Sequence, residues 1–301
     1  MVGLLRVVRP ACGHIASDVR LAMVRSTLVL LMLGIVGVFP GAAVELEDLY
    51  FAQTVVTGTE EPERTRGFQA GLLEVIVKVT GDSRLVESEA VATLLEDAGR
   101  FVQQFEYEDR MKGIPVHDEQ GTRDRPHFLR IRFRPAEVDG ALDELGLSKW
   151  PADRPAVAVW LGVETANGRY VLHASGPEGY GQRAALIEAS RRNGVPVILP
   201  EGEGPGSAIV FDAIAMDDLN RLKPFSEGAE ALLVGVLSLA EGGYWDIEWN
   251  FRWQQQDRAW RMEGVSFDTA LNRGVQDAAL ILSGKDAGAS IGEPDGTHPR
   301  R

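Results

Sequence analysis

Apolar and polar residues alternate in two segments of the first half of the chain, and a period of two is typical of strands with one buried face. The first segment is 101–109, in which aromatic and glutamate side chains fall on opposite faces. The second is 128–134, in which Leu, Ile and Phe oppose three arginines. We expect these strands to pair as an antiparallel hairpin around a long polar loop, residues 110–126.

A helical period appears on either side of this hairpin. Apolar residues three and four positions apart form one face of a first helix: Phe68, Leu72, Val75, Ile76 and Val79. Glutamates precede this helix, where they complement its dipole, and Gly81 ends it. A second helix begins at Pro135 and ends at Gly146. With a strand at 46–57 and a short helix at 87–98, the first half has the order β-α-α-β-β-α.

Buried strands and helices follow each other in the second half. Continuous apolar runs such as 156–163 are typical of strands covered on both faces. We expect strands at 156–163, 169–173, 195–199, 231–239, 244–255 and 258–267, and helices at 179–193, 217–222 and 268–283. The turn between the last two strands is expected near Gln256 and Asp257. The fold class is therefore α+β or α/β, with two small domains, each a mixed or antiparallel sheet packed with helices.

Composition sets the expected boundaries of these domains. Residues 148–155 (SKWPADRP) contain two prolines and indicate a linker between a first domain at 44–147 and a second at 156–283. Residues 284–301 are rich in Gly, Asp and Pro, and we expect them to form a disordered tail.

The N-terminal residues, 1–43, have the pattern of a secretory signal peptide. A basic start is followed by an uninterrupted apolar run of 13 residues and then by Pro-Gly-Ala-Ala. We place cleavage after Ala43, which predicts a periplasmic protein. A bilayer-spanning helix needs about 20 apolar residues, so the alternative, an inner-membrane anchor formed by residues 26–43, is disfavoured. Translation starts at Met1 or at Met23.

The charge balance restricts the possible partners. The chain has 301 residues, of which 45% are hydrophobic, and its 31 basic and 44 acidic residues give a net charge of -13. Broad nucleic-acid binding depends on cations that contact phosphates, so we expect no nucleic-acid partner. The single cysteine, Cys12, precedes the expected cleavage site. The mature chain therefore has no disulfide and no cysteine metal site.

Three arginines in the strand 128–134 are the candidate binding residues: Arg130, Arg132 and Arg134. With Arg123 and Arg125 they could bind a phosphate-bearing head group or an acidic partner. The alternative is that they pair across the hairpin with Glu106 and Glu108. Such exposed pairs contribute little to stability, and the arginines would then form an ordinary solvated face.

Residues 245–253 (WDIEWNFRW) place three tryptophans, Trp245, Trp249 and Trp253, on one face of a strand with Ile247 and Phe251. If this face is exposed, it could bind sugars or anchor a partner. We favour the alternative that it is core, covered by the last helix and extended by Trp260 and Met262.

Other polar clusters do not form a recognisable site. His117, Asp118, Glu119 and His127 carry metal-binding atoms, but adjacent residues do not easily turn toward one ion, and we expect no metal. His173 has no obvious partner. The loop at 200–208, with Gly202, Gly204 and Gly206, lacks the residues of a phosphate loop and the spacing of a dinucleotide fingerprint, so we expect no cofactor. No nucleophile elbow and no zinc-protease motif occurs.

Several stretches of the chain resemble an uncharacterised proteobacterial envelope family, the domain of unknown function 2066. They include GLLEVIVKVTGD (71–82), RFVQQFEYE (100–108), LRIRFRPAEVDGALDELGLSKW (129–150) and RPAVAVWL (154–161). The resemblance spans most of residues 48–283. It implies a signal-bearing envelope protein and carries over no functional residues.

Together these features favour an exported cell-envelope protein that is a non-catalytic binding or accessory module, whose partner is another envelope protein or polymer. One alternative is a hydrolase that acts on cell-envelope glycan or peptide through a carboxylate pair that sequence spacing does not reveal. The other is a periplasmic module anchored at its N-terminus, which touches the membrane only if the signal is uncleaved.

Overall fold

The computed structural model of the protein describes residues 49–113, 125–201, 207–216, 218–222, 226 and 228–285. Several predicted features lie outside these ranges: the signal peptide with its cleavage site at Ala43, the loop residues His117, Asp118 and Glu119, the glycines of 202–206, and the tail after residue 285. The chain divides into two units, Met1–Pro40 and Gly41–Arg301, and all described residues belong to the second. The domain boundaries at 148–155 stay a prediction.

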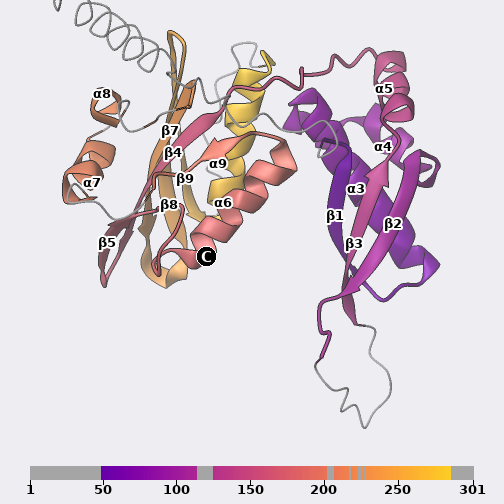
Figure 1. The fold of residues 1–301 in the computed structure, drawn as a ribbon, viewed down its shortest axis with the longest axis horizontal. Coiled ribbons are helices and arrows are strands. Elements are labelled where there is room, and N and C mark those ends of the chain that lie inside the picture. The colour runs from indigo at the N-terminus through magenta and orange to yellow at the C-terminus, as the bar shows by residue number, and fades with distance from the viewer. Residues whose placement is uncertain are drawn as a thin grey trace, which may run out of the picture. The chain divides into compact units, whose positions relative to one another are not determined.

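Three antiparallel strands form the first sheet, in the order β1 (Phe51–Thr57), β3 (Pro126–Phe133) and β2 (Val102–Asp109) (Figure 1). The predicted hairpin of β2 and β3 is confirmed, with Glu106 opposite Arg130. The sequence did not predict that β3 is the central strand and also pairs with β1. Alternation identifies the buried face of a strand, but it does not identify the strand's neighbours.

Helix α3 (Glu61–Thr80) packs on this sheet through the apolar face that its period predicts. The helix approaches the sheet closely at Gly67 and Gly71. A Cβ at these positions would lie 2.5 Å from the side chain of Leu129 and 2.7 Å from that of Ile131. Glycine at both positions therefore permits a helix-to-sheet distance that any larger residue would increase.

The helix predicted at 87–98 is shorter in the structure. It forms α4 (Glu89–Leu95), with 3-10 helices at Ser83–Glu87 and Ala98–Phe101 on either side. The Ser88 hydroxyl accepts a hydrogen bond from the Val91 backbone nitrogen at 3.4 Å, so the α-helix starts after Ser88. The helix that begins at Pro135 is confirmed as α5 (Pro135–Glu144).

The segment 148–155 forms neither helix nor strand, as predicted, but it contains a buried arginine. Arg154 donates hydrogen bonds to the carbonyl oxygens of Lys78 and Gly194, both at 2.7 Å. Its guanidinium lies 4.0 Å from the ring centroid of Trp150. Burial lowers the pKa of Arg154 to about 10, with a smaller opposing effect from Tyr50. The guanidinium is still protonated at neutral pH, so each of these contacts is charge-assisted.

The second sheet is mixed, which confirms the predicted fold class of sheets packed with helices. Its main path runs in the order β5 (Gly168–Val171), β4 (Val157–Thr165), β7 (Ala231–Leu239), β8 (Trp245–Trp253) and β9 (Gln256–Val265), and β6 (Val197–Ile198) pairs with β4. Strands β4 and β7 are parallel, while β7, β8 and β9 form an antiparallel meander. Strand β9 is therefore an edge strand.

Helices cover both faces of this sheet, as Figure 1 shows. On one face lie α6 (Tyr180–Asn193) and α9 (Phe267–Leu282), with α9 packed against β7, β8 and β9. On the other face lie α7 (Ser207–Ala215) and α8 (Leu219–Leu222), where Phe211 and Ile214 form a buried cluster with Trp160 and lie next to Gly162 of β4. This double coverage explains the continuous apolar runs of β4 and β7.

Three local predictions for the second half were wrong. The segment at 200–208 does not extend as a loop through Ser207, because α7 begins there. The strand at 195–199 is reduced to two residues, Val197 and Ile198. The turn between β8 and β9 falls at Gln254 and Gln255 rather than after them, and Gln254 has a positive φ of 55°. Within the described ranges, no helix is long and apolar enough to cross a membrane.

Candidate functional site

The aromatic face of β8 is core, which confirms the favoured interpretation of WDIEWNFRW. Ile247, Trp249 and Phe251 are buried, and Trp245 and Trp253 pack partly buried at its ends. The indole nitrogen of Trp249 donates to the carbonyl oxygen of Ala270 in α9 at 3.2 Å. Trp249 is therefore not available to a sugar or a partner.

The predicted arginine face is paired with the chain's own acidic residues. Arg130 lies 3.4 Å from Glu106 and 2.5 Å from Glu108, both on β2, and its Nε donates to the side-chain oxygen of Gln53 on β1 at 3.1 Å. The cross-strand pairing that the sequence offered as an alternative is thus present at Arg130. Whether this face also binds a partner stays a prediction.

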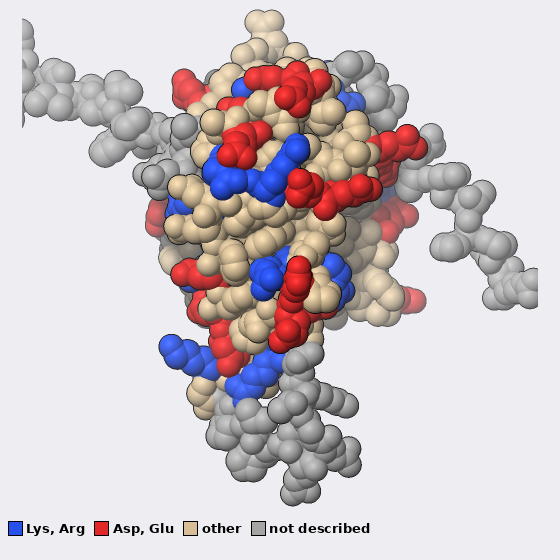
Figure 2. All heavy atoms as spheres, turned by 90° about the vertical axis from the view of Figure 1, so that its right-hand side faces the viewer, with Lys and Arg blue, Asp and Glu red and all other residues tan. Residues whose placement is uncertain are grey.

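Of the two other candidate arginines, Arg132 lies on β3 and Arg134 is the residue before α5. Arg134 pairs with Glu137 at 2.6 Å and donates to the carbonyl oxygen of Val102 at 3.0 Å. The Arg132 guanidinium lies 6.0 Å from the ring centroid of Phe51. Figure 2 shows basic and acidic side chains interleaved on the side of the molecule that it presents. The field of these arginines is therefore partly neutralised at short range.

Of the histidines that the sequence singled out, His127 and His173 are described, and His127 lies opposite Asp109 in the register of β2 and β3. His127 Nδ1 lies 2.8 Å from the carbonyl oxygen of Arg125, and the backbone oxygen of His173 accepts a hydrogen bond from Arg183. Among the described residues, no group of three or more His, Cys, Asp or Glu side chains is placed to hold a metal ion.

A groove that the sequence did not predict lies along β1. It has a volume of about 370 Å³ and is lined by Gln53, Thr54, Val55, Ala70, Leu73, Glu74, Val77, Val86, Arg192, Asn193, Asn272 and Gln276. Two exposed valines border it: Val55 of β1 is 54% exposed, and Val86 of the 3-10 helix Ser83–Glu87 is 56% exposed. They add apolar surface beside the edge of β1 that does not pair with β3.

The register shows which main-chain groups of β1 face this edge. The Phe133 nitrogen donates to the Tyr50 oxygen, and the Gly58 nitrogen donates to the Arg125 oxygen. Even-numbered residues of β1 therefore bond to β3, and odd-numbered residues point their N–H and C=O groups outward.

Side chains satisfy the two ends of this outward row. Lys78 Nζ donates to the Phe51 oxygen, and the Thr57 nitrogen donates to Glu63 at 3.2 Å. Between these ends, the main-chain groups of Gln53 and Val55 have no partner in the described part of the chain. The open main-chain groups of this edge are thus those of Gln53 and Val55, and both residues line the groove.

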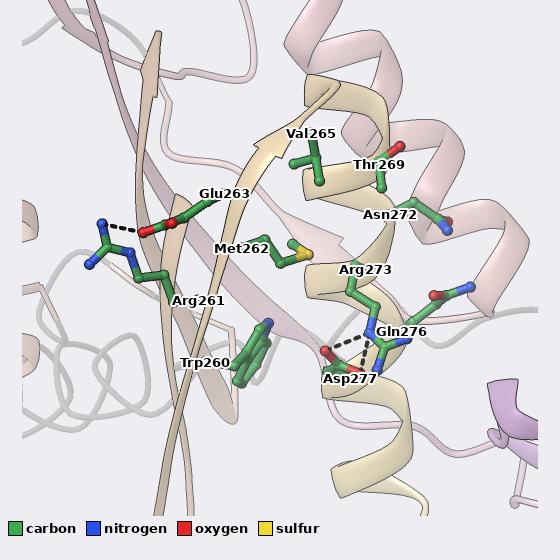
Figure 3. Close-up of a pocket in the computed structure, with 10 residues that line it drawn as sticks. All are labelled: Trp260, Arg261, Met262, Glu263, Val265, Thr269, Asn272, Arg273, Gln276 and Asp277. Atoms are coloured by element: carbon green, nitrogen blue, oxygen red, sulfur yellow. Dashed lines mark hydrogen bonds and ion pairs between the residues drawn. The ribbon is translucent and has the colours of Figure 1, made fainter. Parts of the chain in front are cut away.

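A second pocket lies between β9 and α9 (Figure 3). Its volume is about 460 Å³, and it is lined by Trp260, Arg261, Met262, Glu263, Val265, Thr269, Asn272, Arg273, Gln276 and Asp277. Asp277 is 1% exposed, and the Arg273 Nε lies 3.0 Å from both of its carboxylate oxygens. At the rim, Arg261 pairs with Glu263 at 2.9 Å.

Sequence reasoning placed Trp260 and Met262 in the core and missed this pocket. Trp260 is indeed buried, but α9 does not cover the edge strand completely. The spacing of Thr269, Asn272, Arg273 and Gln276 indicates one polar helix face next to the apolar one. That spacing was the available signal, although it does not say that the face borders a cavity.

Comparison with known proteins gives one family match. Residues 43–151 match the model of a family described as Domain of unknown function (DUF8605), and the matched segment contains the whole first sheet with its helices. No curated protein matches the chain.

The resemblance to the domain of unknown function 2066 is therefore wrong, because the family that matches is a different one. The quoted stretches are a helix that ends at a left-handed glycine, Gly81, and the alternating strands β2 and β3. Similar residues occur in any fold that has a helix ended by glycine and a hairpin with one buried and one exposed face. Such stretches indicate local structure, but they say little about common ancestry.

Proposed function

We propose that this protein is an exported, non-catalytic binding module of the cell envelope, and that it holds an extended segment of a partner protein against the edge of β1. The observation that carries the proposal is the pair of outward-facing main-chain groups at Gln53 and Val55, which lie beside a groove lined by both apolar and polar side chains. An added strand would satisfy these donors and acceptors, and its side chains would enter the groove.

The N-terminal sequence supports export. A basic start, an apolar run too short to span a bilayer and the small residues before Val44 are typical of a cleaved signal peptide. Export would place the β1 edge in the periplasm, where an envelope protein or polymer is the available partner. The anchored form, with residues 26–43 retained, would leave the same edge accessible from the membrane surface.

Charge near the edge supports an acidic partner segment. Arg130 reaches β1 through Gln53, and Arg132 lies on the same face beside Phe51. A strand added to β1 would bring its own side chains within diagonal reach of this face. Acidic residues in the partner would then compete with Glu106 and Glu108 for the guanidinium of Arg130.

The carboxylate that lines the groove, Glu74, favours a binding role over hydrolysis. Glu74 lies 3.2 Å from Lys78 and 2.8 Å from Arg191, so its charge is neutralised by two cations. A glycan or peptide hydrolase that uses two acids needs one of them protonated near neutral pH. Among the described residues that line the groove, Glu74 is the one carboxylate, so no second acid stands beside it to complete such a pair.

The experiment has two parts, carried out in the native host. Intact-mass measurement of the purified protein tests export, and a chain that begins at Val44 is expected. A photo-crosslinking residue at position 55 then tests the edge, with the same residue at Ile187 in α6 as the matched control, because Ile187 is 58% exposed. We expect a defined crosslinked product from position 55 that position 187 does not give.

Substitutions at the two surfaces distinguish binding at the β1 edge from binding at the arginine face. Val55→Lys adds a charge to the open edge. With the crosslinking residue moved to position 86, which lines the same groove, Val55→Lys should abolish the product, while Ile187→Lys should leave it unchanged. Arg130→Glu with Arg132→Glu should weaken the product if the partner segment is acidic. A folded Val55→Lys protein that still gives the same product would contradict strand addition, and a retained N-terminus would contradict cleavage.

A further inference from the structure

The pocket between β9 and α9 contains a buried hydrogen-bond donor without an acceptor. Trp260 is 6% exposed, and its indole nitrogen is buried with no hydrogen-bond partner in the described part of the chain. Two other buried indoles of this sheet are satisfied: Trp249 donates to Ala270 at 3.2 Å and Trp160 donates to Ser226 at 3.0 Å. A buried N–H without an acceptor is costly, so an acceptor that enters the pocket would be favoured there.

The indole points into the pocket. Figure 3 shows its nitrogen on the side of the ring that faces Met262 and α9. The pocket is open enough to admit a molecule much larger than water, because a single water occupies about 30 Å³ and the pocket has about 460 Å³. The missing acceptor can therefore belong to a ligand.

The opposite wall presents further donors. Arg273 uses its Nε to bind Asp277, and its two terminal nitrogens have no acceptor within the described ranges. The ion pair fixes the guanidinium beside the pocket, because Asp277 is buried. Asn272 accepts from Asn193 through its side-chain oxygen at 3.2 Å, which leaves its amide nitrogen as a donor.

Apolar groups complete the pocket on the β9 side. The side chain of Met262, that of Val265 and the ring of Trp260 line it. Donors at one wall and apolar surface at the other match a molecule with a carboxylate on an apolar body. A carboxylate is planar and accepts two parallel hydrogen bonds from a guanidinium, and a second oxygen lone pair remains for an indole N–H.

We infer that this pocket binds a small organic carboxylate, with its oxygens on Arg273 and Trp260 and its apolar part against Met262 and Val265. The site lies on a different sheet from the β1 edge, although Asn272 and Gln276 of α9 line both the pocket and the groove there. Its test follows Trp260 and Arg273, which do not line the groove, so its outcome is distinguishable from that of the partner segment. Its volume falls in the ordinary range of small-molecule sites.

The test follows the indole N–H resonance of Trp260 by NMR in the 15N-labelled full chain, with Trp260→Phe to assign the signal. The probes are acetate, hexanoate and benzoate, and hexanamide is the uncharged match for hexanoate. We expect a saturable shift of this resonance, tighter binding of hexanoate and benzoate than of acetate, and about tenfold weaker binding of hexanamide.

Variants test the two polar contacts. Arg273→Lys keeps a cation beside buried Asp277, so the fold is retained. It removes the pair of parallel hydrogen bonds from the guanidinium to the carboxylate, and the affinity for hexanoate should fall about tenfold. Arg169→Gln is the matched control, since Arg169 pairs with Asp212 at 3.2 Å and does not line the pocket, and it should leave binding unchanged. Trp260→Phe keeps the ring and should weaken hexanoate roughly fivefold, as measured by calorimetry.

Three results would overturn the inference. One is an indole resonance that no carboxylate shifts at millimolar concentration, with a cross-peak to bound water in its place. Another is equal binding of hexanoate and hexanamide. The last is unchanged affinity for hexanoate in the folded Arg273→Lys protein.

Discussion

Trp249 gives the sharpest test of the packing described for the second sheet. Its indole lies between two glycines, Gly235 of β7 and Gly274 of α9. A Cβ at position 274 would lie 2.6 Å from Cε2 and 2.7 Å from Nε1 of Trp249, and a Cβ at position 235 would lie 2.6 Å from its Cε3. The perturbation is Gly274→Ala, which adds one methyl group to this contact.

The expected change in the free energy of unfolding is the sum of opposing effects. Alanine in place of glycine inside a helix stabilises it by up to about 1 kcal/mol. Overpacking of a close contact costs about 1–3 kcal/mol, and displacement of the indole also weakens its hydrogen bond to Ala270, which contributes about 1 kcal/mol. We therefore expect Gly274→Ala to lower the free energy of unfolding by about 1–3 kcal/mol, against the direction of helix propensity.

Urea unfolding followed by circular dichroism measures this change. Gly140→Ala is the matched control, because Gly140 lies in α5 with nothing within 4 Å of an added Cβ, and it should raise the free energy of unfolding. In a Trp249→Phe background the cost of Gly274→Ala should shrink, as a double-mutant cycle would show. If Gly274→Ala is as stable as the unsubstituted protein, the sandwich of Trp249 between the two glycines is refuted.

Three further predictions concern the polar groups of the fold. Arg154→Met should lower the free energy of unfolding by about 3–5 kcal/mol in urea titrations, because two buried carbonyl groups lose charge-assisted partners, and a loss below about 1 kcal/mol would contradict this. The hydrogen bond from Arg84 lowers the pKa of Asp82 despite its burial, so the stability from Asp82 is present above about pH 4 and is lost as the pH falls through the lowered pKa. Asp82→Asn should therefore flatten the acid side of a stability-against-pH curve, and an unchanged slope would exclude this contribution. Arg130→Gln should change the free energy of unfolding by less than about 1 kcal/mol, since its ion pairs are exposed, and a larger loss would show a structural role.

Local patterns in the sequence predicted most of the elements correctly. Helix α3 and the hairpin of β2 and β3 were predictable because their apolar residues repeat with the period of the element. The core position of Trp249 was predictable because α9 carries a matching apolar face. In each case one buried face determines both the element and the side that it turns to the core.

The features that the sequence did not predict depend on neighbours distant in the chain. The pairing of β1 with β3 joins residues 51–57 to residues 126–132, and alternation does not encode that choice. The buried state of Arg154 depends on carbonyl oxygens of Lys78 and Gly194, which no spacing connects to it. Both candidate sites escaped prediction for the same reason, because locating them requires knowledge of which strand lies at the edge of its sheet.

Amide hydrogen exchange along β1, measured in the free protein and in the complex captured from position 55, tests the central proposal most directly. Strand addition predicts that the amides of Gln53 and Val55 exchange quickly in the free protein and become protected in the complex, while those of Ala52 and Thr54 are protected in both, because they bond to β3. Unchanged exchange at Gln53 and Val55 in the complex would contradict the proposal that a partner segment extends this sheet.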